Sequence, residues 1–565
     1  MKKLKKILSV VLTLAMVLGM SVTTWAASAG DDNTVGTKDD RGSITLAGIA
    51  KEAGIQIALY PVMQAQYDSK KGNFTGYSNP YNVPTDDKGN YTVDADELEA
   101  IVTAVTEANV TALNGVTWTS YEDANGFGYK TNDTVPVGMY LVAVTGAEAK
   151  IYNYAVASVY YESKNGGNLI NGGTVDFISD ANVGVKVSEN PGVTKTAKDK
   201  DNNVTGSVNI GDTVKYEVEI NPVPYYGGEY PVLNVTDTLS DGLTLDKNSI
   251  KVYHTAVAES NLLTADYYTL DTDTPQTLVV DFVKKDINTN TNIYNLNKYA
   301  GGKIIITYSA TLNDEAGINQ AGNNNDVTLK YTKDSKVETT TENPPEEKKD
   351  KTFTYTFDID GSVTGSVTKG IITKYGEEKD TTTDENLPLP NAEFTLYTDE
   401  ACNTPYTNKS LVEKDNSKIP FDGTVASNGE GQLPIKGLAT GTYYLKETKA
   451  PDGYSLNTHV FKIEISAKYY GDTDVEGGQI PDGMKKGQLA SWSIKIDNED
   501  IATFTVNNGN VDNFDEEAGV GIQNTKISSL PSTGGIGTTI FTIGGCAIMI
   551  LAAGLYFASR RKSAK

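Results

Sequence analysis

The chain has 565 residues, more than one hydrophobic core ordinarily organises, so about three domains are expected. Its net charge of −24 argues against nucleic-acid binding, because a protein that meets phosphates needs a basic surface. Only two histidines and two cysteines are present, which leaves a Ser-His-Asp or Cys-His enzyme poorly supported.

The first 29 residues have the composition of a secretory signal peptide. Four lysines precede an apolar stretch, and residues 27–29 (Ala-Ser-Ala) have the small-residue form that a signal peptidase accepts. Residues 24–26 offer an earlier cleavage site. The sequence therefore predicts a secreted protein whose mature chain starts near Ala27 or Gly30.

The mature chain shows strand-like alternation far more often than helical periodicity. Alternation is clear in TVKYEVEI from Thr213 and in KIIITYSATL from Lys303. The one convincing helix is VDADELEAIVTAV, with Asp94 and Glu97 as a capping box and an apolar stripe formed by Leu98, Ile101, Val102 and Val105. We expect a mainly β fold of consecutive immunoglobulin-like β-sandwich domains, with one short helix in the first.

Changes in composition suggest the domain boundaries. SENPGV, around Pro191, and the polar stretch VETTTENPPEEKKDK, from Val337, both look like connections between domains. The predicted parts are a signal peptide (1–29), an N-terminal domain (30–188), two further β-sandwich domains (189–336 and 337–529) and a C-terminal segment (530–565).

In the second domain, strand alternation places three polar residues among apolar neighbours. They are Lys195 in VTKTA, Asp237 in VLNVTDTL and Asn325 in NNNDVTLKYT; a shifted strand would put Asn323 or Asn324 in the place of Asn325. A carboxyl group in an apolar core should have a raised pKa and stay protonated. Each residue alone could be an edge position or half of a salt bridge.

The third domain repeats the same three residue types. Lys374 in GIITKYG, Glu447 in GTYYLKETKAPDGY and Asn524 in GVGIQNTK share faces with apolar residues, and Lys369 is an alternative to Lys374. The recurrence of a lysine, an acid and an asparagine favours a common chemical role over chance.

The C-terminal segment begins with the word LPSTG, formed by Leu530, Pro531, Ser532, Thr533 and Gly534. The uncharged run from Ile536 to Ser559 is long enough to cross a hydrocarbon core of about 30 Å as a helix. Four basic residues follow, on the cytoplasmic side by the positive-inside rule. A plain membrane anchor would show the apolar run and the basic tail but would not need the LPSTG word.

LPxTG, an apolar span and a basic tail together resemble the sorting signal of Gram-positive wall-anchored proteins. PLPNAEFTLY, GTYYLKETKAPDGY and QNTK resemble the CnaB-type domain of Gram-positive pilins, and VTDTLSDGLTL with GNNNDVTLKY resembles the preceding domain of SpaA-type backbone pilins. The resemblance runs from about Gly192 to the end of the chain. In the first domain VPVGMYLV is its main trace.

The resemblance implies an intramolecular isopeptide bond in each of the last two domains. A buried lysine loses its charge and becomes nucleophilic, a neutral acid polarises the asparagine carbonyl, and ammonia leaves. The implied sets are Lys195 with Asn325 and the acid Asp237, and Lys374 with Asn524 and the acid Glu447. The chain is then no enzyme in the usual sense, and neither a cofactor nor a metal is expected.

The resemblance also implies that a sortase cysteine attacks the Thr533 carbonyl, releases Gly534 onward and passes the acyl group to an amine. Family members carry the accepting lysine in a VxVYPK-like strand at the end of the first domain. Here NVGVKVSENP stands in that place, so Lys186 is the candidate pilin lysine, about two positions before the family's own, where Ser188 falls. Alternation points Lys186 outward.

The function implied is that of a structural backbone subunit of a sortase-assembled, wall-linked pilus that supports adhesion. Its partners would be a class C-type pilin sortase, a housekeeping sortase, identical subunits in a covalent homopolymer, accessory pilins and peptidoglycan. The alternative is a monomeric wall-anchored adhesin with an isopeptide-stabilised stalk.

Overall fold

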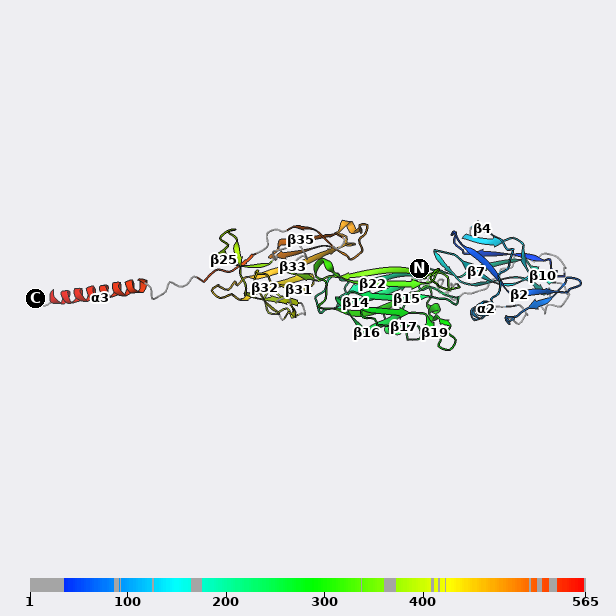
Figure 1. Cartoon of the computed structure of the whole chain (residues 1–565), viewed down its shortest axis with the longest axis horizontal. Helices are drawn as coiled ribbons and strands as arrows, with labels where there is room; N and C mark the ends of the chain where they lie inside the picture. The colour runs from blue at the N-terminus through cyan, green and yellow to red at the C-terminus, as the bar shows by residue number, and fades with distance from the viewer. Residues whose placement is uncertain are drawn as a thin grey trace, which may run out of the picture. The chain divides into compact units, whose positions relative to one another are not determined.

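The structure, a computed structural model, describes residues 35–85, 91, 93–123, 126–163, 175–336, 338–359, 372–407, 411–414, 417–421, 423–507, 510–515, 521–527 and 536–562. Strands dominate these residues, and two α-helices, α2 (Ala95–Glu107) and α3 (Ile536–Lys562), lie near the beginning and at the end (Figure 1). The prediction of a mainly β chain is confirmed.

The first part of the chain folds into two sheets around one core. One sheet has the strand order β11-β1-β5-β4 with β6 beside β1, the other has the order β10-β9-β7-β2-β3, and β8 pairs with β12. Residues of both sheets, such as Leu46 and Val142, share one buried cluster, as in a β-sandwich. The strands are β1 (Arg41–Ala47), β2 (Gln56–Tyr67), β3 (Phe74–Ser78), β4 (Trp118–Asp123), β5 (Gly126–Thr131), β6 (Val135–Pro136), β7 (Gly138–Thr145), β8 (Lys150–Tyr152), β9 (Ala155–Ser163), β10 (Val175–Ile178), β11 (Asp180–Gly184) and β12 (Val187–Glu189).

Helix α2 covers the outer face of the sheet that contains β7. Alternate residues of β7 enter different clusters. Val142 belongs to the sandwich core, whereas Leu141 lies beneath the helix in one cluster with Leu98, Ile101, Val102 and Val105. At the start of α2, Asp94 accepts a hydrogen bond from Glu97 N (2.9 Å), and the Glu97 carboxylate accepts one from Asp94 N (2.6 Å). The predicted helix, its apolar stripe and its capping box are confirmed.

The next part of the chain, green in Figure 1, is a second sandwich with the strand orders β13-β14-β21-β16 and β17-β18-β15-β22-β23, beside a short pair β19-β20. The expected alternation is present in β14, where every second residue is buried. The strands are β13 (Gly192–Lys198), β14 (Thr213–Asn221), β15 (Leu233–Leu239), β16 (Leu243–His254), β17 (Thr269–Asp271), β18 (Thr277–Asp281), β19 (Lys284–Lys285), β20 (Asn292–Ile293), β21 (Ile304–Leu312), β22 (Asn323–Tyr331) and β23 (Glu346–Thr354), and the 3-10 helices are η1 (Glu259–Asn261), η2 (Asn295–Tyr299) and η3 (Asn319–Ala321).

The last globular part contains three sheets, with the orders β24-β31-β28-β29, β26-β25-β37 and β30-β27-β32-β33-β34-β35-β36. In the β26-β25-β37 sheet, β25 and β37 are far apart in the chain but lie side by side in parallel, with Lys374 opposite Ile522. The elements are β24 (Phe357–Asp358), β25 (Thr373–Lys379), β26 (Asn386–Pro388), β27 (Glu393–Tyr397), β28 (Leu411–Lys414), β29 (Ser417–Pro420), β30 (Thr424–Ala426), β31 (Ile435–Leu438), β32 (Gly441–Lys449), β33 (Val460–Tyr469), η4 (Glu476–Gly478), β34 (Leu489–Ile496), β35 (Glu499–Asn507), β36 (Asn510–Asp515) and β37 (Gly521–Gln523).

The strand pairing bears on the boundary predicted at residue 336. Strand β23 pairs with β22 over its whole length, so the second part of the polar stretch, from Glu346, forms an edge strand of the second sandwich. By compactness the chain separates into two units, one running to Gly317 with Ala321–Tyr355 and Tyr470–Gln488, the other made of Ile318–Gln320, Thr356–Tyr469 and the chain from Leu489. The division into three domains stays a prediction.

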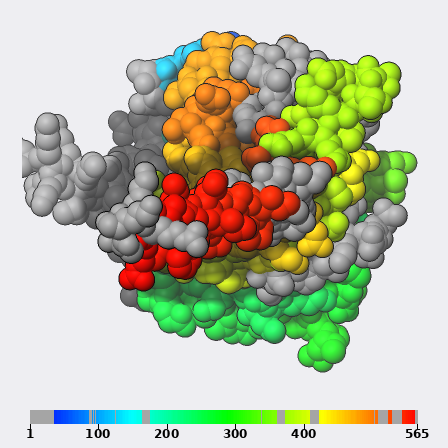
Figure 2. Space-filling view, turned by 90° about the vertical axis from the view of Figure 1, so that its left-hand side faces the viewer, coloured from blue at the N-terminus to red at the C-terminus, as the bar shows by residue number. Residues whose placement is uncertain are grey.

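Helix α3 agrees with the predicted membrane span. Its segment Thr542–Arg560 is the one helix of the described chain that is long and apolar enough to cross a membrane. Between Ile543 and Phe557 its large apolar side chains are exposed; α3 is red in the space-filling view (Figure 2). The predicted signal peptide and the residues Leu530–Gly534 lie outside the described residues.

Candidate cross-linking sites

The three polar residues predicted in the third domain meet in its core. Lys374 lies on β25, Glu447 on β32, and Asn524 directly after β37. The Lys374 ammonium donates a hydrogen bond to Asn524 Oδ1, and Asn524 Nδ2 donates one to Glu447 Oε1 (2.8 Å). Lys374 Nζ is 3.7 Å from the same Glu447 oxygen, and neither side chain has exposed surface. The parallel pairing of β25 with β37 thus brings the lysine to the asparagine.

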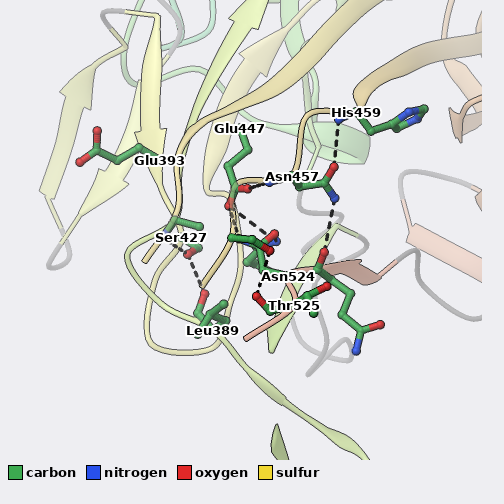
Figure 3. A network of polar contacts seen from close by, with 12 residues as sticks. Leu389, Glu393, Ser427, Glu447, Asn457, His459, Asn524 and Thr525 are labelled. Carbon is green, nitrogen blue, oxygen red and sulfur yellow. Dashed lines mark hydrogen bonds and ion pairs between the residues drawn. The ribbon is translucent and has the colours of Figure 1, made fainter. Parts of the chain in front are cut away.

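Figure 3 shows how Glu447 is held. Its carboxylate points toward Asn524, and its second oxygen accepts a hydrogen bond from Asn457 N (2.6 Å), which lies in the segment between β32 and β33. The Asn457 side chain is itself fixed, because its oxygen accepts from His459 N (2.9 Å). The acid therefore keeps one oxygen for the reacting amide.

Burial also prepares the nucleophile. Removal from water lowers the pKa of Lys374 to about 8 against the opposing effect of Glu447. Roughly a tenth of such amines would be neutral at pH 7, compared with about one in 2,500 for an ordinary lysine. A neutral amine in contact with an amide and beside an acid can attack the amide carbon.

The second domain brings its three residues together differently. Lys195 lies on β13, Asp237 on β15, and Asn325 on β22, where it faces Leu239 in the neighbouring strand. The Lys195 ammonium contacts Asp237 Oδ2 and also donates to the Tyr308 hydroxyl (2.8 Å). Asn325 Nδ2 donates to the same hydroxyl (2.8 Å). Tyr308 therefore stands between the lysine and the asparagine.

The electrostatics of this site favour neutral partners. Desolvation lowers the pKa of Lys195 to about 8, although Asp237 opposes it, and desolvation raises the pKa of Asp237 against the effect of Lys195. Both side chains have no exposed surface. A proton is therefore more easily held by the acid and lost by the lysine than in water.

The structure bears on the alternatives that the sequence left open. Asn323 is occupied with the backbone: its side chain donates to the carbonyls of Gly317 and Thr354 (both 3.1 Å) and accepts from Gly317 N (2.9 Å). Burial alternates along β22, so Asn324 faces the other side of the strand from Asn325. Of the three asparagines, Asn325 is the one whose side chain donates a hydrogen bond to the same Tyr308 hydroxyl as Lys195. Lys369 lies outside the described residues.

Two contributors to the second site were missed in the sequence. Tyr308 is on the inward face of the strand KIIITYSATL, and the available signal was a tyrosine at an apolar position, because a buried hydroxyl needs a partner. Asp350 of β23 accepts a hydrogen bond from Lys195 N (2.7 Å) and so fixes the backbone of the nucleophile. It was missed because the strand that carries it has the composition of a linker.

Lys186 is not the exposed lysine that alternation predicts. Val183 and Val185 are buried as expected, but Lys186 is only partly exposed, and its Nζ lies 3.4 Å from the centroid of the Tyr225 ring. It lines a cavity of about 490 Å³ together with residues of α2 and of the segment 225–231. Burial lowers the pKa of Lys186. Tyr225 comes from the second sandwich. The local alternation around Lys186 therefore could not predict that a tyrosine ring covers its ammonium group.

An uncross-linked third domain should become more stable as the pH rises. In the variant Asn524→Ala, Lys374 stays an amine with a pKa of about 8 when folded and about 10.4 when unfolded. Between these values the unfolded chain binds more protons, so the free energy of unfolding should increase by roughly 2 kcal/mol from about pH 8 to about pH 10. Denaturant titrations at each pH measure this, with Asn524→Ala, Lys374→Met as the control that should lack the increase. Equal slopes in the two variants would contradict it.

Three segments of the chain match known protein families. Residues 210–335 match the Cna-B-like domain of Gram-positive pilin backbone subunit 2, residues 376–479 the SpaA prealbumin-like fold domain, and residues 522–565 the LPXTG cell wall anchor motif. All three matches agree with the resemblances found in the sequence.

Relatives match over three quarters of the chain or more. The trypsin-resistant surface T6 protein of Streptococcus pyogenes serotype M6 is 23% identical, with 93% of this chain and 96% of that protein covered. Among solved structures, the T6 backbone pilin of S. pyogenes has a TM-score of 0.46 at 18% identity, covering 87% of this chain and 100% of that one. The major pilin SpaD of Corynebacterium diphtheriae has a TM-score of 0.38 at 17% identity, covering 76% and 91%. The chain is thus a homologue of Gram-positive backbone pilins, which carries a Cna-B-like and a SpaA prealbumin-like domain and the LPXTG anchor of a cell-wall-attached surface protein.

Proposed function

We propose that this chain is the repeating shaft subunit of a covalent pilus, and that isopeptide bonds between Lys195 and Asn325 and between Lys374 and Asn524 stabilise it. The observation that carries the proposal is the buried set of lysine, acid and asparagine that occurs once in each of the two domains. A fully buried lysine is rare unless it serves a purpose, and two in equivalent settings favour a shared chemistry.

In each domain the reaction is a transamidation that the fold itself promotes. The neutral lysine Nζ attacks the asparagine Cγ, the neighbouring acid, Asp237 or Glu447, assists the reaction, the bond from Cγ to Nδ2 breaks, and ammonia leaves. Lys374 and Asn524 are 150 residues apart and lie at the first and last strands of one sheet. A bond between them would prevent a pull on the ends of the domain from separating these strands.

Polymerisation requires a second acyl transfer, between copies. A pilin sortase, of class C type, would cleave the bond between Thr533 and Gly534 and hold the threonine as a thioester. Lys186 of the next copy would then attack the thioester, form an amide and release the sortase thiol. A lysine with a lowered pKa presents more neutral amine for this step. A housekeeping sortase would attach the finished polymer to peptidoglycan, and accessory pilins would join it.

The test is the formation of polymer in a Gram-positive host that supplies a pilin sortase. The unaltered chain should give a ladder of covalent multimers that survives boiling in detergent, and Thr533→Ala should give monomer only. Monomer from the unaltered chain, with normal attachment to the wall, would contradict the shaft and leave a monomeric adhesin as the function.

A further inference from the structure

The two cross-linking sites differ in how their reacting nitrogens are connected. In the third domain a single oxygen, Glu447 Oε1, lies 2.8 Å from Asn524 Nδ2 and 3.7 Å from Lys374 Nζ. In that site one carboxyl oxygen accepts a hydrogen bond from the nitrogen that leaves and lies within ion-pair distance of the nitrogen that attacks. One carboxyl group can therefore take a proton from one and give it to the other.

In the second domain the acid is an aspartate, which is one methylene shorter. Asp237 Oδ2 contacts Lys195 Nζ, whereas Asn325 Nδ2 donates its hydrogen bond to the Tyr308 hydroxyl. The same hydroxyl receives a hydrogen bond from Lys195 Nζ, and both distances are 2.8 Å. The oxygen that touches both reacting nitrogens is thus the phenol oxygen, in the role that Glu447 Oε1 has in the third domain.

Packing fixes the Tyr308 ring in this position. It lies on β21 opposite Tyr216 of β14, and the two rings stack with centroids 5.2 Å apart and an interplanar angle of 23°. Tyr308 is only 3% exposed, so water does not compete readily for its hydroxyl. The hydrogen of a hydroxyl rotates about the C–O bond, so one oxygen can accept from one nitrogen and donate to the other.

We propose that Tyr308 is a catalytic residue for the cross-link of the second domain and carries the proton from the attacking to the leaving nitrogen. This inference rests on the isopeptide bond proposed above. When Lys195 Nζ bonds to Asn325 Cγ, the tetrahedral intermediate carries an excess proton on Nζ and negative charge on Oδ1, which neutral Asp237 stabilises. Nζ gives its proton to the Tyr308 oxygen while Tyr308 gives its own to Nδ2. The bond from Cγ to Nδ2 then breaks, the carbonyl reforms, ammonia leaves and Tyr308 is unchanged.

The test is Tyr308→Phe in the chain from Gly30 to Thr533, because phenylalanine keeps the stacked ring and removes the hydroxyl alone. Cross-linking is followed by mass spectrometry at times after a pulse of synthesis. Proteolytic mapping separates the branched peptide of Lys195 and Asn325 from that of Lys374 and Asn524. A general acid–base group typically contributes about 100-fold or more, so the first peptide should form about 100-fold more slowly in the variant. The second peptide should form at the unaltered rate.

The matched control is Tyr226→Phe. The Tyr226 hydroxyl is also buried in the second sandwich, 3.0 Å from the carbonyl oxygens of Val232 and Thr332, and touches neither reacting nitrogen. Equal slowing by both variants would mean that a loosened core, rather than a lost proton carrier, explains the effect, and would overturn the assignment. So would a Tyr308→Phe rate within about threefold of the unaltered chain. Failure of the unaltered chain to form the first peptide would instead refute the proposed bond itself.

Discussion

Replacing Glu447 by Ala is expected to leave the third domain without its cross-link and to lower its free energy of unfolding by roughly 4 to 5 kcal/mol or more. In the loop-closure treatment used for disulfides, a bond that closes a loop of about 150 residues stabilises a domain by approximately that amount. The variant loses a further contribution, because Lys374 stays buried as an amine and its carboxylate partner is gone. Asp237→Ala should have the corresponding effect on the second domain.

Each variant alters one cross-linking site, so the unaltered site in the other domain serves as its internal control. In intact mass, each alanine variant should show the loss of one ammonia instead of two. Glu447→Ala should form only the bond of the second domain, and Asp237→Ala only the bond of the third. Glu447→Gln fills the same volume, so it should also lack the bond but without a cavity. Guanidinium titrations give the stability of each domain. Retention of both bonds in both alanine variants would contradict the assignment of the acids.

Replacing Lys186 by Arg is expected to abolish polymer formation while leaving the chain folded. Arginine keeps a cation over the Tyr225 ring, so the packing seen in the structure should persist. Its guanidinium stays protonated at every physiological pH and cannot attack a thioester. The ladder of multimers should therefore be replaced by monomer, although the intramolecular bonds and their loss of ammonia stay intact.

The matched control is Lys150→Arg. Lys150 lies on β8, which pairs with β12 just after Lys186, and its ammonium contacts Glu189 at the surface. This variant should polymerise like the unaltered chain. A full ladder from Lys186→Arg would show that another lysine accepts the threonine.

Local patterns predicted much of this fold because they depend on one element at a time. The stripe of α2 and its capping box follow from helical spacing, and the inward direction of Lys195, Asp237 and Glu447 follows from alternation along a strand. Such residues could be found from the sequence because a polar group on an apolar face contradicts its surroundings.

What the sequence could not show depends on contacts between elements. Tyr308 looks like any inward aromatic residue until its hydroxyl is placed between Lys195 and Asn325. Strand β23 is so rich in charge that it resembles a linker, although it completes a sheet and supplies Asp350. Alternation in the sequence predicts that Lys186 points outward, but it lies between β11 and β12, and a tyrosine from the second sandwich covers it.

The most direct test of the account is the intact mass of the recombinant chain from Gly30 to Thr533. Each isopeptide bond removes one ammonia, so the account predicts a mass lower than that of the sequence by two ammonias. Proteolytic mapping should assign one loss to Lys195 with Asn325 and the other to Lys374 with Asn524. A mass equal to that of the sequence would mean that the buried lysines and acids are only ion pairs, and would contradict the central claim.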